Sequence, residues 1–133
     1  VKQHRTKTTN RYFNYIYVRM GAHTLIHKRT EDDIWKNLFE LPLVETEKDL
    51  SEEEFLACPQ FHALFAEGEV RRVRTLLRGV KHVLSHRVIY TNFYEVTLPD
   101  NSSSFSSYQR VAVEDLGRYA VPRLIHAFLE KYV

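Results

Sequence analysis

Two long runs of aromatic and β-branched residues limit the folds open to this chain. They are RYFNYIYVRM at residues 11–20 and RVIYTNFYEV at residues 87–96. Such side chains pack well on a pleated sheet and lose side-chain freedom in a helix, so both runs predict strands. Any fold of this chain must therefore place two long strands, about 70 residues apart, within its sheet structure.

Helical signals lie between and after these runs. Ser51 with Glu54 forms a capping box that predicts a helix from Glu52, with Leu50 facing Phe55 as a hydrophobic staple. Pro59 predicts that this helix stops near Cys58 and that a second one runs from Pro59 to Gly68. Apolar residues at helical spacing behind Pro122 predict a final helix. Strands and helices in this order indicate an α+β domain with one mixed or antiparallel sheet covered by helices.

Other segments carry weaker signals. Residues 23–29 after Gly21 suggest a second strand that closes a hairpin with residues 11–20, and residues 34–44 suggest a loop with a buried Trp35 before a short strand. Residues 70–79 are ambiguous between helix and strand. Residues 100–107, DNSSSFSS, resemble a flexible hairpin tip, and YQRVAV after them suggests a short strand.

Length and composition bound the function classes. At 133 residues with 44% apolar content, the chain can form one domain with a real core, and its apolar runs are too short for a membrane span. The single cysteine, Cys58, excludes an internal disulfide and a Cys-rich metal site, so we expect a reducing compartment. Because the chain begins Val-Lys-Gln-His, we expect it to be a piece of a longer polypeptide, with residues 1–10 as a linker.

Charge is strongly segregated behind a net charge of +2. Residues 1–30 carry seven Lys or Arg and no acid, residues 31–69 carry twelve acids and two bases, and residues 70–94 carry six bases and no acid. If the two basic blocks meet in the fold, they could form a phosphate-binding face. The alternative is that each block is a solvated surface.

Three sets of residues are candidates for chemistry. His23 and His27 share a strand face but lie about 13 Å apart, too far to share a zinc ion. Glu52, Glu53 and Glu54 could bind Mg²⁺, although acids also favour the first turn of a helix without any metal. Ser85 and His86 lack a nearby acid that would orient the imidazole, which argues against a catalytic triad.

Four blocks in order resemble the C-terminal domain of MutY-type adenine DNA glycosylases, over roughly residues 11–132. They are RYFNYIYV, IWKNLFELPLVE, KHVLSHRVIYTNFYEV and YAVPRLIHAFLEKY. The Trp-x-x-Leu-Phe-Glu-x-Pro part alone is shared with the wider Nudix superfamily, and the ordered set is more specific. The resemblance implies a Nudix-like (MutT-like) sandwich at residues 11–133, a mixed β-sheet between helices.

The chain departs from true Nudix hydrolases at their metal-binding signature. No arginine occurs between Arg29 and Arg71, Gly68 has no Arg-Glu-x-x-Glu-Glu before it, and Pro59 interrupts the candidate helix. We therefore expect no metal site and no nucleotide hydrolysis. The alternatives to a repair role are a divergent Nudix hydrolase acting on a nucleoside diphosphate derivative and a protein-interaction module that keeps the Nudix shell.

The resemblance also implies a recognition site. The family loop written Phe-Ser-His contacts 8-oxoguanine opposite adenine, and it matches Leu84-Ser85-His86 here, with Leu in place of Phe. Lys81, His82 and Arg87 flank it and are expected to hold the DNA backbone.

The implied partners are double-stranded DNA with 8-oxoguanine:adenine and an N-terminal catalytic domain that this chain does not include. That domain would carry the glycosylase activity and an iron-sulfur cluster, so no cofactor and no glycosylase activity are expected in this chain alone. We expect a monomer in the bacterial cytoplasm, associated with the nucleoid.

Overall fold

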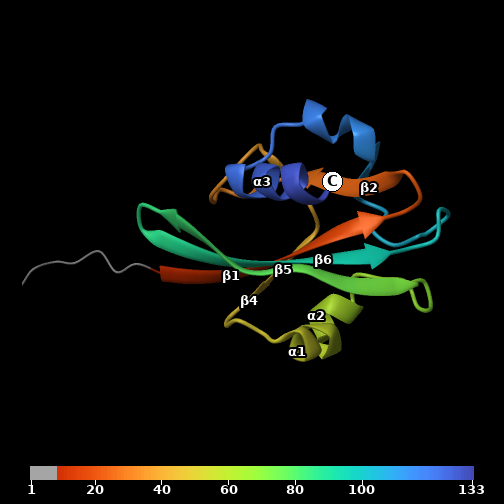
Figure 1. Ribbon diagram of the computed structural model, residues 1–133, viewed down its shortest axis with the longest axis horizontal. Coiled ribbons are helices and arrows are strands. Elements are labelled where there is room, and N and C mark those ends of the chain that lie inside the picture. The colour runs from red at the N-terminus through yellow and green to blue at the C-terminus, as the bar shows by residue number, and fades with distance from the viewer. Residues whose placement is uncertain (1–8) are drawn as a thin grey trace, which may run out of the picture.

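The computed structural model describes residues 9–133, in which two sheets are packed with helices (Figure 1). The larger sheet has the order β4-β1-β6-β5 and consists of β1 (Thr9–Arg19), β4 (Leu43–Thr46), β5 (Arg72–Leu84) and β6 (Arg87–Thr97). The smaller sheet has the order β3-β2-β7 and consists of β2 (His23–Lys28), β3 (Phe39–Glu40) and β7 (Gln109–Ala112). The larger sheet is mixed, because β1 runs parallel to β6 and antiparallel to β4.

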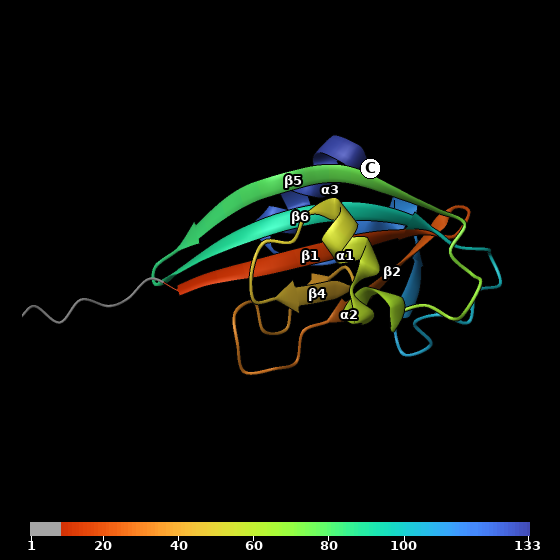
Figure 2. The same cartoon turned by 90° about the horizontal axis from the view of Figure 1, so that it is seen from below.

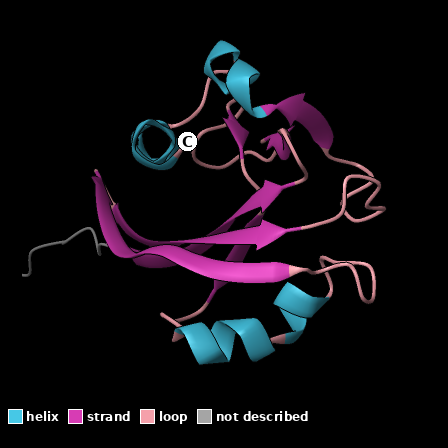
Figure 3. Cartoon of the chain, turned by 45° about the vertical axis from the view of Figure 1, so that its right-hand side comes forward, coloured by secondary structure: helices cyan, strands magenta, loops and turns pink. Residues whose placement is uncertain are grey.

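Helices lie on both faces of the larger sheet (Figure 3). The short helices α1 (Glu52–Ala57) and α2 (Pro59–His62) cover one face. The other face carries α3 (Arg123–Tyr132), the 3₁₀ helix η1 (Val113–Arg118) and the smaller sheet. The predicted α+β class, with a mixed sheet between helices, is confirmed, but the strands form two sheets instead of the single one expected. None of the helices in the described part of the chain has the length and apolarity needed to cross a membrane.

The core is divided by the larger sheet into two clusters. Along β1, Phe13 and Tyr15 face the cluster under α3, whereas Ile16 and Val18 face the cluster under α1 and α2. All four side chains are fully buried. A strand buried on both faces has an unbroken apolar pattern, which explains why residues 11–20 show so little polar alternation.

The local helix signals are confirmed. The Ser51 hydroxyl accepts a hydrogen bond from Glu54 N at 3.1 Å, and the Glu54 carboxylate accepts one from Ser51 N at 2.9 Å. The first helix ends at Ala57, with Cys58 as its C-cap. The second helix is shorter than predicted, since α2 ends at His62, and Pro122 is the N-cap of α3.

The predicted hairpin between residues 11–20 and 23–29 is wrong. A turn does form, because Met20 and His23 exchange backbone hydrogen bonds of 2.9 and 3.0 Å around Gly21. The two strands then separate into different sheets, because β1 pairs with β4 and β6, whereas β2 pairs with β3 and β7. Leu25 and Ile26 point to opposite faces of β2, one into each core cluster.

The predicted hairpin tip at residues 100–107 is also wrong, because β6 and β7 belong to different sheets. Glu69 anchors this loop, because its carboxylate accepts hydrogen bonds from the Ser102 and Ser104 hydroxyls at 2.5 and 2.7 Å. These bonds lower the pKa of Glu69 to about 2.

Three further expectations are revised or resolved. The sheet begins at Thr9, so residues 9 and 10 belong to β1, and the rest of the expected linker lies outside the described residues. The ambiguous segment at 70–79 contributes to strand β5. Trp35 is only half-buried and has a φ of 59°.

Candidate nucleic-acid interface

The Ser85-His86 pair is a two-residue turn at the end of the β5–β6 hairpin. Leu84 and Arg87 are cross-strand partners, and both Ser85 and His86 are exposed beyond them. β1 supports the turn from the side, since Thr9 N donates to the His86 carbonyl oxygen at 3.1 Å. Its backbone is therefore held by three strands, while the two side chains are free to contact a ligand.

The residues of β5 that lead to the turn alternate between two faces. His82 and Leu84 point toward the α3 side, where Leu84 packs on the core and the His82 ring lies 5.9 Å from the Trp35 ring in an edge contact. Lys81 and Val83 point to the opposite face, and Val83 is 65% exposed. Lys81 is thus free to contact a phosphate, whereas His82 is a packing partner of Trp35.

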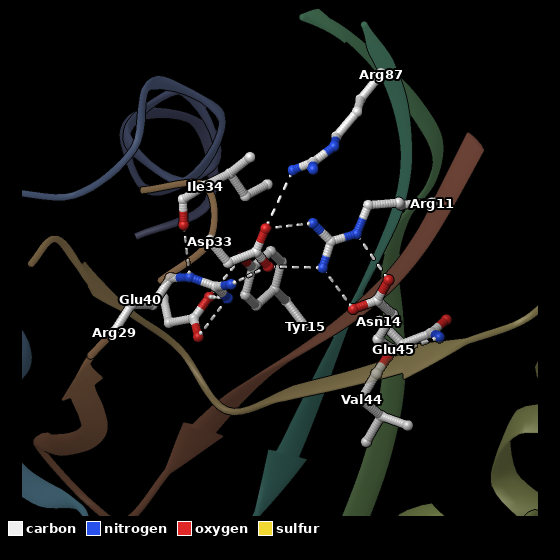
Figure 4. Close-up of polar contacts among 10 residues, drawn as sticks. All are labelled: Arg11, Asn14, Tyr15, Arg29, Asp33, Ile34, Glu40, Val44, Glu45 and Arg87. Carbon is white, nitrogen blue, oxygen red and sulfur yellow. Dashed lines mark hydrogen bonds and ion pairs between the residues drawn. The ribbon is translucent and has the colours of Figure 1, made fainter. Parts of the chain in front are cut away.

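Arg87 is held inside a cluster centred on Asp33 (Figure 4). The Asp33 carboxylate accepts two hydrogen bonds from Arg11, at 3.0 and 2.9 Å, and one from Arg87 at 3.1 Å. Arg29 donates to it at 3.1 Å. The bonds from Arg11 are the main reason that the pKa of Asp33 falls to about 2.

Further carboxylates extend this cluster. Glu45 accepts two hydrogen bonds from Arg11, each at 2.8 Å. Glu40 is almost fully buried and accepts from Arg29 at 3.0 and 3.1 Å and from the Tyr15 hydroxyl at 2.7 Å. Burial, together with the negative charge of Glu40, raises the pKa of Tyr15. Figure 4 shows these groups between β1, the segment before β3, and β4.

The cluster changes the interpretation of the charge blocks. Arginines of both basic blocks do come together, but carboxylates of the acidic block lie among them: Asp33, Glu40 and Glu45 with Arg11, Arg29 and Arg87. Of the two alternatives for the basic blocks, a shared phosphate-binding face does not form at this meeting point. Arg87, which we expected to hold DNA backbone, bonds to Asp33 and fixes the base of the turn.

A family comparison identifies the domain. The family model described as the NUDIX domain matches residues 14–131, which is most of the chain. This chain belongs to the Nudix family. No match was found among curated proteins.

Solved structures share the Nudix fold at low sequence identity. The C-terminal domain of mouse MUTYH, in complex with human PCNA, has a TM-score of 0.72 at 15% identity, covering 92% of this chain and 86% of that one. A MutT structure from work on Aliivibrio salmonicida and Vibrio cholerae has a TM-score of 0.63 at 16% identity, with coverage of 92% and 96%. MutT from Methanosarcina mazei Go1 has a TM-score of 0.60 at 17% identity, with coverage of 93% of both chains.

The glutamates at the start of α1 do not fit a Nudix metal site. Glu52 accepts a hydrogen bond from the Thr75 hydroxyl at 2.5 Å, and Glu54 is used in the capping box. Within residues 9–133, no three side chains of His, Cys, Asp or Glu gather closely enough to hold a metal ion. Glu54 therefore caps the helix, and Glu52 attaches it to β5.

The sequence did not predict the contacts that hold the base of the Ser85-His86 turn. Asp33 and Trp35 contact Arg87 and His82 from the β2–β3 loop. The only available signal was the acidic run Glu31-Asp32-Asp33 directly after a basic block. That pattern shows which charges could pair, but not which strand they reach.

Proposed function

We propose that this chain is the non-catalytic lesion-recognition domain of an adenine DNA glycosylase, which detects 8-oxoguanine opposite adenine. The observation that carries the proposal is the exposed Ser85-His86 turn, held by three strands on a Nudix domain whose helix lacks a metal cluster. The fold likeness to the C-terminal domain of mouse MUTYH supports it.

The chemistry of the lesion suits a serine. Oxidation of guanine converts N7 from an acceptor into an N–H donor and adds a carbonyl oxygen at C8. The Ser85 hydroxyl can accept from the N–H and donate to the oxygen, whereas plain guanine offers no N7–H. His86 beside it can bind a base edge or a phosphate, and Lys81 can bind the backbone.

The proposal assigns the reaction to another part of the parent protein. Removal of adenine requires the base to leave the duplex and enter a catalytic pocket, which we assign to an N-terminal domain with an iron-sulfur cluster. We expect this chain alone to show no glycosylase activity. Its affinity for DNA should be weak, because one domain makes few phosphate contacts. That affinity should fall as the salt concentration rises, because the contacts it does make release counterions from the DNA.

The first test replaces the turn side chains. The variant Ser85→Ala with His86→Ala should reduce the preference of this chain for 8-oxoguanine:adenine over guanine:adenine duplex by roughly 5- to 100-fold, because a specific base contact is worth about 1–3 kcal/mol. Fluorescence anisotropy at low salt measures both affinities. The matched control is Ser107→Ala with His126→Ala, which removes one exposed serine and one exposed histidine elsewhere. An unchanged preference in the turn variant would refute the recognition role.

The alternative is a Nudix hydrolase, which the likeness to MutT structures favours. We expect no turnover of 8-oxo-dGTP with Mg²⁺, since Glu52 and Glu54 are committed to Thr75 and Ser51. Release of phosphate or pyrophosphate at ordinary enzymatic rates, measured on the purified chain, would favour the hydrolase.

A protein-interaction module is the third possibility. An apolar cavity of about 540 Å³ lies between α2 and the start of β5, lined in part by Phe61, Phe65 and Val70. Partner binding without any dependence on the lesion would support this role.

A further inference from the structure

The two edges of the larger sheet carry opposite charge. β5 forms one edge and includes Arg72, Arg74, Arg78 and Lys81, with no acidic residue in the strand. β4 forms the other edge, and its only charged residue is Glu45. Figure 2 shows β5 as the outermost strand over its full length, ending at the Ser85-His86 turn. A polyanion is therefore attracted to the β5 side of the sheet and not to the β4 side.

The cations of the β5 edge differ in how far they are neutralised. Arg74 pairs with Glu95 at 3.1 Å. Arg78 lies 3.7 Å from Asp49 and donates to the Tyr94 hydroxyl and to a backbone carbonyl, so it holds β5 to the body of the domain. The remaining cations at this edge, among the described residues, have no carboxylate within the 4.0 Å of an ion pair: Arg71, which directly precedes β5, Arg72 and Lys81. Arg71 does donate to the backbone carbonyl oxygens of Gly68 and Glu69, at 2.6 and 3.4 Å.

The spacing of Lys81 and Arg72 along β5 suits contacts with a DNA backbone. Lys81 is four residues from the turn, about 13 Å along an extended strand, and Arg72 is about 30 Å farther on. This span is close to one helical turn of B-form DNA, which is about 34 Å. Both side chains are exposed, and they extend from the same edge to opposite faces. Lys81 follows Val80 of the α3 cluster and points to the α1 face, whereas Arg72 precedes Val73 of the α1 cluster and points to the α3 face. No described strand pairs with the outer side of β5. A duplex that meets the turn can thus pass along the same edge.

A duplex that extended from the turn over the β2–β3 loop, instead of along β5, would meet unfavourable charge. The loop beside the base of the turn presents exposed Glu31 and Asp32, and the nearby Arg11 and Arg87 are already paired with carboxylates. A phosphate backbone on that side would meet uncompensated negative charge.

We propose that the β5 edge, with Arg71, Arg72 and Lys81, is the surface that binds the DNA phosphate backbone beside the Ser85-His86 turn. This inference rests on the proposed function, because it gives the DNA-facing side of that recognition site. Charged residues on an edge strand also prevent strand-to-strand aggregation, and this is the competing explanation.

The test compares two triple variants of equal charge. The edge variant is Arg71→Gln, Arg72→Gln and Lys81→Gln. The control removes three exposed cations on η1 and α3, as Arg118→Gln, Arg123→Gln and Lys131→Gln. Affinity for one duplex, with and without 8-oxoguanine:adenine, is measured by anisotropy between about 50 and 200 mM salt.

Each lost phosphate contact lowers the slope of log affinity against log salt by about 0.9. The edge variant should therefore lose about 2–3 of slope with either duplex, while the control changes by less than about 0.5. An equal loss in both variants, or none in the edge variant, would overturn the inference. Sedimentation checks whether the triple variant self-associates. If it does, the salt slope is measured instead for the single variants Arg72→Gln and Lys81→Gln, at concentrations too low for association. Each should lose about 0.9, and no change would overturn the proposal.

Different results would refute the recognition role of the turn and the DNA-binding role of the β5 edge. Loss of lesion preference in the Ser85 and His86 variant, with an unchanged salt slope in the edge variant, would refute the edge and leave the recognition role. The reverse result would leave a DNA-binding edge without lesion recognition.

Discussion

At the scale of residues, Asp33 has the largest influence on the candidate site. Its carboxylate bonds to Arg11, Arg29 and Arg87, which belong to or directly follow three different strands. A single side chain therefore joins the β2–β3 loop, the start of β1 and the base of the turn. Hydrogen bonds from Arg11 lower the pKa of Asp33 to about 2 against the opposite effect of burial, so the carboxylate remains charged throughout the physiological pH range.

The Asp33→Asn variant should lower the free energy of unfolding at pH 7 by about 1–2 kcal/mol, because the folded state lowers the pKa of this carboxyl. The sign follows from the direction of that shift. The contribution is complete above pH 4 and is lost as the pH falls through about 2, so wild type and variant should converge near pH 2. Urea denaturation at several pH values measures this. The control is Asp32→Asn, an exposed neighbour, and equal effects of the two variants would contradict the prediction.

Whether a side-chain hydrogen bond could be predicted from the sequence depended on how many residues separate its two partners along the chain. The capping box of Ser51 and Glu54 was predicted because both residues lie within one helical turn. The bonds from Asp33 to Arg11 and Arg87 cross 22 and 54 residues, and no local pattern specifies them. The resemblance implied a loop at Ser85 and His86, and the structure has an exposed turn there.

At the scale of elements, the β5–β6 hairpin determines where the turn lies. Its register shifts twice, between Thr75 and Leu77 and between Leu77 and Val80. Gly79 lies in the second irregular stretch with a φ of 70°, and its N–H donates to the Asn92 side chain at 2.8 Å. Bulges increase the local twist of a strand, so this segment sets the direction of the hairpin end.

We expect Gly79→Ala to destabilise the domain by about 1–2 kcal/mol, because an L-residue in the left-handed region is strained. No neighbouring atom lies within 4 Å of the position that its Cβ would take, so steric overlap adds nothing. Urea denaturation measures the change. Gly117→Ala is the control, since Gly117 has equal space and no positive φ, and its effect should stay within about 0.5 kcal/mol. Equal effects at the two positions would exclude backbone strain as the cause.

The elements themselves were more predictable than their pairing. Residues 11–20 and 87–96 were predicted as strands because their composition is decisive. The hairpin predicted at Gly21 failed because turn geometry is local, whereas strand pairing depends on partners elsewhere in the chain. β6 pairs along all of β1, and β2 pairs instead with β3 and β7, which come later in the chain.

At the scale of the whole molecule, the Nudix fold and the charge pattern have separate consequences. The resemblance predicted the sandwich, and the family match over residues 14–131 confirms it. The segregated charges did not form one basic face. They are partly cancelled in the Asp33 cluster and partly exposed along β5, a division that required the three-dimensional positions of the strands.

The parallel pairing of β1 with β6 also constrains how the domain is made. Thr9 is opposite Arg87 and Arg19 is opposite Thr97, so each contact closes a loop of nearly 80 residues. Such distant contacts make folding slow. During synthesis, the first strand leaves the ribosome long before its partner exists, and its apolar faces remain without a permanent cover until β6 has emerged. The newly made chain is therefore exposed to aggregation during that interval.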